Sequence, residues 1–190
     1  LTSIGFGRKK NIGLLGAPWA KIYRSEFVRN VAPTEPFRVG VARGQDVLFN
    51  VEMFGLARTV AYYPHVVYRY VISPDSYSHR PSTDFVSRAE ILVSHLTALV
   101  AKYRWDHLNP AIDKLSVDLL EEGIKRLGPR AASSDLIDLA RHEPFAGALR
   151  RTRARDYSIG GLVKMLLLRS RLYATYRRAV GLNHVVRARA

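Results

Sequence analysis

Apolar residues in the C-terminal part of the chain recur every three to four positions, which is the spacing of amphipathic helices. The first of these helices follows Ser82–Asp84, three residues suited to capping a helix N-terminus. The second begins after Pro110 and stops at Gly128-Pro129, a signal for a helix C-terminus. The pattern predicts helices at about residues 85–105, 110–127, 134–141, 144–155 and 158–180.

The first part of the chain, up to residue 80, shows a mixed pattern. Short apolar stretches at Ile12–Leu15 and Trp19–Tyr23 are consistent with strands or turns. The run Thr59–Ile72 is rich in Val, Tyr and Thr and favours two strands. Helices are expected at Ser25–Asn30 and from Asp46 to near Gly55, with a Pro- and Gly-rich loop between them.

We therefore expect an α/β fold, in which a partial mixed sheet is followed by an all-helical C-terminal segment. The pattern changes near residues 73–84, and this change predicts two domains, 1–80 and 81–190. A chain of 190 residues that is 47% hydrophobic is long enough to bury a core. Both parts are therefore expected to be folded.

Composition excludes several classes of protein. No stretch approaches the roughly 18 uncharged apolar residues that a membrane-spanning helix needs, and the first residues lack the pattern of a signal peptide. We therefore expect a cytoplasmic location. The absence of cysteine excludes disulfides, thiolate nucleophiles and cysteine-based zinc sites.

The formal net charge of +14 is concentrated near the C-terminus. Residues 141–190 hold 12 Lys and Arg against two acids, Glu143 and Asp156, which gives +10 for this segment. A segment this basic usually meets phosphate, on nucleic acid, on anionic lipid or on a phosphorylated substrate. Composition does not choose among these three.

Three short motifs follow one another in the first part of the chain. They are Gly16–Arg24 (GAPWAKIYR), Gly44–Phe49 (GQDVLF) and Tyr68–Tyr70 (YRY), the last followed by Ser76–Ser78. No H-E-x-x-H or G-x-S-x-G motif occurs, which disfavours metalloproteases and serine hydrolases. The order and spacing of the three motifs, over about residues 14–80, resemble the family-2 GT-A glycosyltransferases that build bacterial surface polysaccharides. Those enzymes typically show Pro-Trp-x-Lys-Leu-Tyr, a Glu-Asp pair heading a helix, and a Tyr-x-Tyr strand.

The resemblance implies that Asp46 is the catalytic base of a sugar transfer. When a sugar is transferred with inversion, the acceptor hydroxyl loses a proton as it attacks the anomeric carbon, so a carboxylate must lie within reach of that hydroxyl. At the start of a helix, the terminal amides and the helix dipole would favour the ionised carboxylate. The simpler alternative is that Asp46 only caps the helix.

The resemblance also implies binding roles for other residues. Trp19, Lys21 and Gln45 would lie on the acceptor side, with Gln45 replacing the usual Glu of the family. Alternatively, Trp19 is a core aromatic residue and Lys21 a solvated cation. The cations that would face the diphosphate leaving group are Arg69, His79 and Arg80, which are alternatively exposed surface residues.

The donor-binding half of such an enzyme is missing from these residues. The family holds a divalent metal, Mg or Mn, through an Asp-x-Asp motif in an N-terminal part, and no Asp-x-Asp occurs in this chain. We therefore expect no metal ligands here, and expect the chain to be a fragment that does not turn over alone. Its partners would be a nucleotide-sugar donor and a saccharide, polyol-phosphate or lipid-linked acceptor.

The basic C-terminal region leaves further functions open. Lys164, Arg171 and Arg178 share a face of the last predicted helix, so residues 158–180 are a candidate contact with anionic membrane at the inner face of the cell membrane. A nucleic-acid-binding module would use the cluster Arg150, Arg151, Arg153 and Arg155, but no recognised RNA- or DNA-binding signature accompanies it. The third alternative is a non-catalytic helical scaffold.

Overall fold

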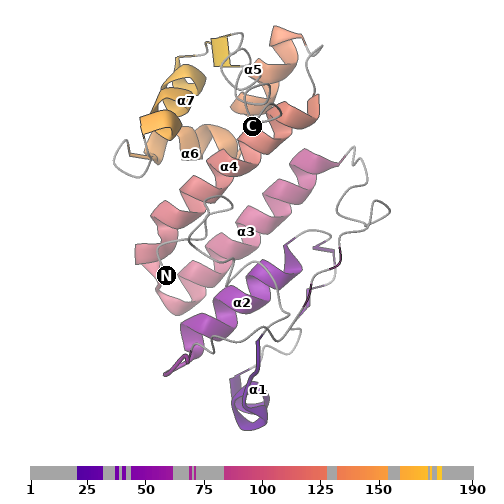
Figure 1. Cartoon of the computed structure of the whole chain (residues 1–190), viewed down its shortest axis with the longest axis vertical. Coiled ribbons are helices and arrows are strands. Elements are labelled where there is room, and N and C mark those ends of the chain that lie inside the picture. Colours follow the sequence, from indigo (N-terminus) through magenta and orange to yellow (C-terminus); the bar gives the residue numbers. More distant parts are fainter. Residues whose placement is uncertain are drawn as a thin grey trace. The chain divides into compact units, whose positions relative to one another are not determined.

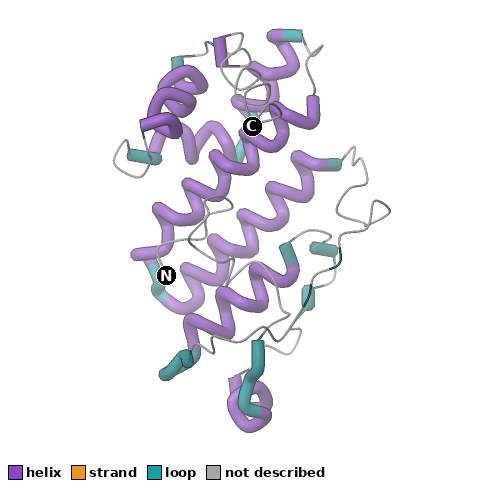
Figure 2. The backbone as a smooth tube through the Cα atoms, in the orientation of Figure 1, coloured by secondary structure: helices purple, strands orange, loops and turns teal. Residues whose placement is uncertain are grey.

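The computed structural model is helical over most of the residues that it describes. These residues are 21–31, 37–38, 40–41, 44–61, 69, 71, 84–127, 132–153, 159–170, 172 and 175–176. Helix accounts for 76% of them and none lies in a strand, so the prediction of a partial mixed sheet is wrong. Figure 2 shows the described residues as helices and loops alone.

The expected strands fail where the structure describes their residues. Lys21–Tyr23 and Thr59–Ala61 form irregular backbone, as do Arg69 and Val71. Val60 and Val71 are 65% and 81% exposed. The strand preference of β-branched residues depends on packing against neighbouring strands and burial of one face. These exposed side chains lack that burial, so local preference alone does not make them strands. Ile12–Leu15 lies outside the described residues.

The chain divides into two compact units, Ser3–Arg104 and Trp105–Ala190. The predicted domain boundary near residue 80 falls outside the described residues and stays a prediction. The first unit contains α1 (Ser25–Val31), α2 (Gln45–Leu56) and α3 (Phe85–Tyr103) (Figure 1). Helices α2 and α3 lie side by side and share the buried core of this unit. That core includes Val47, Leu48, Val51, Met53, Phe85, Ala89, Leu92, Leu96, Leu99 and Val100.

Gly44 allows α2 to begin close against α3. Its φ of 79° lies in the left-handed region, which a residue with a side chain rarely adopts. A Cβ at this position would lie 2.7 Å from both Cδ atoms of Leu92. Glycine therefore meets two requirements at once, an unusual backbone conformation and a close approach between helices.

The second unit is built around α4 (Asn109–Leu127), which follows the short 3-10 helix η2 (Asp106–Leu108). Helix α4 contacts α5 (Ser133–Arg141) and α6 (Phe145–Arg151), and α6 also contacts α7 (Ile159–Arg169). The core of this unit includes Leu115, Leu120, Leu136, Phe145, Ala148, Met165 and Leu168. The helices predicted from the apolar stripes are present, but α7 ends at Arg169, well before the predicted residue 180.

A bidentate ion pair joins α4 to α6. The Arg151 guanidinium donates to both oxygens of Asp113, with Nη2 2.8 Å from Oδ1 and Nε 3.2 Å from Oδ2. Planar guanidinium and carboxylate groups match in this geometry, which fixes the register of the two helices.

Among the described helices, none combines the length and apolar character needed to cross a bilayer.

Candidate active site

The first turn of α2 carries the predicted catalytic acid. Gly44 is the N-cap residue, so Asp46 lies inside the first turn instead of capping the helix. The backbone N–H of Val47 donates to Asp46 Oδ1 at 2.9 Å. This hydrogen bond fixes the direction of the carboxylate at the N-terminus of the helix.

Burial decides the proton affinity of Asp46. The side chain is half-buried, and its pKa is raised above 3.8 because desolvation disfavours the charged form. Backbone hydrogen bonds act in the opposite direction, as expected for an acid in the first turn of a helix, and so does the charge of Lys21, but these are the smaller effects. The result is a carboxylate that accepts a proton more readily than an ordinary aspartate.

Lys21 lies close enough to interact with Asp46. Its pKa is lowered because the side chain is partly buried, and the negative charge of Asp46 opposes that effect. Two residues that the resemblance assigns to one site thus interact electrostatically, although 25 positions separate them. A cation beside the carboxylate helps to keep it ionised until it receives a proton.

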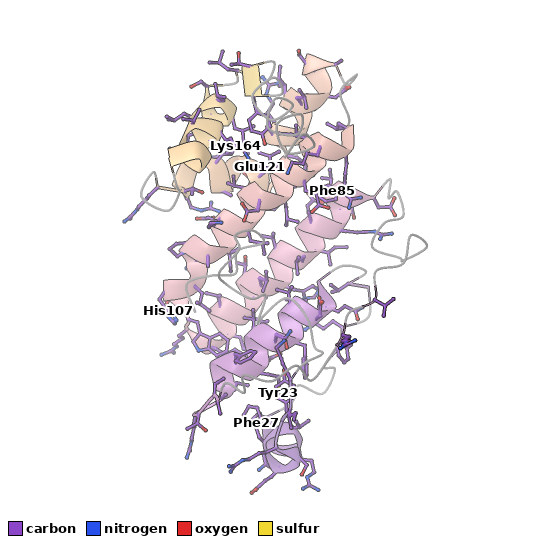
Figure 3. The ribbon with its side chains drawn as sticks, viewed as in Figure 1. Tyr23, Phe27, Phe85, His107, Glu121 and Lys164 are labelled. Carbon is purple, nitrogen blue, oxygen red and sulfur yellow. The ribbon has the colours of Figure 1, made fainter. Side chains whose placement is uncertain are left out.

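A partly buried hydrogen bond connects the segment containing Lys21 to α2. Tyr23 Oη donates to Asn50 Oδ1 at 3.0 Å, and Asn50 has no exposed surface. Tyr23 also packs edge-on against Phe49, with ring centroids 5.7 Å apart. Figure 3 labels Tyr23 next to α2. These two contacts therefore hold the segment that contains Lys21 against α2.

Gln45 takes part in holding the loop before α2. Its Nε2 donates to the backbone carbonyl of Arg38 at 3.4 Å. The predicted role of Gln45 in acceptor binding therefore falls on a side chain with a structural contact as well. The amide oxygen of Gln45 is able to accept a hydrogen bond from a sugar hydroxyl.

Glu52 is a buried carboxylate that the sequence analysis did not single out, and it anchors the helix that carries Asp46. Glu52 is 2% exposed. Its Oε1 accepts hydrogen bonds from Tyr103 Oη at 2.6 Å and Lys102 Nζ at 3.3 Å, both from α3, and Oε2 lies 3.5 Å from Arg38 Nη2. Arg38 Nη1 in turn lies 3.3 Å from His95 Nδ1. The signal in the sequence that could have identified Glu52 is an acid among the buried positions of α2, because a buried carboxylate requires charged or hydrogen-bonding partners.

Of the other predicted site residues, the structure describes only Arg69. Arg69 is exposed and lies in irregular backbone. Trp19, His79 and Arg80 lie outside the described residues, so their roles stay predictions. Within the described part of the chain, no three His, Asp or Glu side chains are grouped so as to hold a metal ion.

Several of the basic residues proposed for membrane or nucleic acid form ion pairs with acids of the same chain. Lys164 Nζ lies 3.4 Å from Glu121 Oε2 (Figure 3). Arg150 pairs with Glu143, and Arg151 with Asp113. Arg155, Arg171 and Arg178 lie outside the described residues. Val163 and Leu166 of α7 are about half exposed, so contact of residues 158–180 with a membrane stays a prediction.

Comparison of the chain with protein-family models, with curated proteins and with solved structures finds no match. The chemistry of the site must therefore be argued from the residues that the fold brings together.

Proposed function

We propose that this chain is the acceptor side of an inverting glycosyltransferase and that Asp46 is its catalytic base. One observation carries the proposal: the Tyr23–Asn50 hydrogen bond joins the segment that contains Lys21 to α2, whose first turn carries Asp46. Lys21 and Asp46 each belong to one of the motifs that carry the resemblance, and the two side chains interact electrostatically. The proposal concerns this site and does not depend on the expected sheet.

The geometry supports a single proton transfer. The acceptor hydroxyl gives its proton to the Asp46 carboxylate while its oxygen forms a bond to the anomeric carbon of the donor sugar. The bond from that carbon to the nucleoside diphosphate breaks, and the diphosphate leaves with the electron pair. Desolvation raises the pKa of Asp46 and strengthens it as a base, while the charge of Lys21 offsets a small part of that rise.

The donor nucleotide and its divalent metal would bind to another part of the intact enzyme. The described residues offer no cluster that fits a metal ion, so no step proposed for this site passes through one. What these residues supply is the orientation of the acceptor and the removal of its proton.

Replacing Asp46 tests the proposal in the intact enzyme, in which this chain is joined to a donor-binding part. Asp46→Asn should lower kcat by about 10²- to 10⁴-fold, because the amide cannot accept the proton. Sugar transfer from a panel of nucleotide sugars gives the rates, and circular dichroism checks that the fold is kept. The matched control is Glu26→Gln, an exposed acid in the first turn of α1. Full turnover in Asp46→Asn would refute the proposal.

A further inference from the structure

Three aromatic rings form a cluster against one face of α2. The Phe37 and Phe49 rings are stacked, with centroids 5.3 Å apart and planes 22° apart. Tyr23 meets Phe49 edge-on at 5.7 Å. Phe37 is 49% exposed, although it packs against Phe49. Stacking thus covers part of the Phe37 ring and leaves the rest open to solvent.

This cluster lies beside the candidate base. Phe49 follows Asp46 by three positions in α2, and residues at this spacing are neighbours on one face of a helix. Tyr23 follows Lys21 by two positions, and Lys21 interacts with Asp46. Asp46 and Phe49 are therefore neighbours on one face of α2, about one helical turn apart, and Phe37 stacks on the second of them.

A half-exposed aromatic ring next to a polar group is the combination that binding sites for amphipathic ligands use. A pyranose ring has such a character, since its C–H groups form a flat apolar face while its hydroxyls project from the rim. A linear polyol phosphate has no fixed flat face to lie on an aromatic ring. The exposed face of Phe37 therefore favours the ring sugar.

We propose that Phe37 stacks on the pyranose ring of the acceptor and presents one rim hydroxyl to Asp46, so that the acceptor is a ring saccharide and not a linear polyol phosphate. This inference rests on the proposed function. Phe37 is then a residue that determines acceptor specificity, whereas Asp46 carries the proton.

Binding to the 190-residue chain tests this inference without requiring turnover. Saturation-transfer NMR would be recorded with methyl β-glucopyranoside, methyl β-galactopyranoside and ribitol phosphate as probes. At least one pyranoside should bind, with the strongest transfer to its ring C–H protons, and ribitol phosphate should not compete. Phe37→Leu keeps an apolar side chain against Phe49 but removes the aromatic face, and should raise the pyranoside Kd about fivefold. Phe37→Trp should keep the affinity.

Val60→Ala is the matched control, because Val60 is an exposed apolar residue of the same unit. It should leave the pyranoside Kd unchanged. If Phe37→Leu perturbs the fold, nuclear Overhauser effects between the C–H protons of the pyranoside and the ring protons of Phe37 in the parent chain test the stacking instead. Absence of pyranoside binding, equal affinity in a folded Phe37→Leu variant, or preference for ribitol phosphate overturns the inference. These readouts are separate from turnover in Asp46→Asn, so failure here leaves the assignment of the base to its own test.

Discussion

At the residue scale, burial competes with helix electrostatics at Asp46. The N-terminus of a helix lowers the pKa of a carboxylate through its amides and dipole, whereas loss of solvent raises it. Here the loss of solvent is the larger effect, so the net shift is upward. The same half-burial that strengthens the base makes its ionised form unfavourable in the folded protein.

This balance predicts a pH-dependent effect on stability. A pKa that is higher in the folded state means that folding favours the protonated acid, so the contribution of Asp46 to stability falls as pH rises from below 3.8 through the raised pKa. Asp46→Asn removes this titration. The melting temperature of the variant relative to the parent should therefore increase from acid to neutral pH, as measured by circular dichroism. A difference that does not change with pH would contradict the upward shift.

Gly44 permits a second prediction at this scale. Gly44→Ala should lower the free energy of unfolding by about 2–4 kcal/mol, since it combines left-handed backbone strain with a clash against Leu92. Gly40 provides a matched control, because its φ is 87° but no atom lies within 4 Å of a Cβ placed there. Gly40→Ala should cost only about 1–2 kcal/mol. Equal losses in urea unfolding would show that Leu92 yields without cost.

At the scale of elements, Glu52 ties α2 to α3 and to the loop before α2. Its two oxygens contact Lys102, Tyr103 and Arg38, while Gln45 holds the backbone of Arg38. Apolar contacts between α2 and α3 supply attraction but little direction. The buried carboxylate adds specific partners and so defines how the helix that carries Asp46 is placed on α3.

Removing this carboxylate should be costly. Glu52→Ala removes the carboxylate partner of Tyr103 and of the partly exposed Arg38 and Lys102, and should lower the free energy of unfolding by about 1–3 kcal/mol. Urea unfolding followed by circular dichroism measures the loss, and Glu26→Gln in α1 should change it by no more than about 0.5 kcal/mol. A loss for Glu52→Ala as small as that of the control would mean that solvent replaces the three contacts without penalty.

At the scale of the whole molecule, each of the two units has a core of its own. The first unit contains the residues of the candidate site that the structure describes, and the second is organised around α4. Two cations of residues 141–190, Lys164 and Arg151, pair with acids that lie outside this segment, Glu121 and Asp113. The net charge of +10 for this segment therefore overstates its uncompensated positive charge.

The sequence by itself determined the positions of the main helices, because an apolar stripe at helical spacing must be buried along one side. The resemblance that its short motifs carry also predicted that Lys21 and Asp46 belong to one site. Sequence analysis misjudged Thr59–Ala61, because the strand preference of such residues is realised only with a paired, half-buried neighbour.

Only the tertiary structure decided how these residues behave. The proton affinity of Asp46 depends on how much solvent the fold removes, and the partners of Glu52 come from a loop and from another helix. The stacking of Phe37 on Phe49 likewise joins residues that share no periodic pattern. Burial and long-range pairing are properties of the folded arrangement, so local sequence determines the elements and the packing between them determines the chemistry.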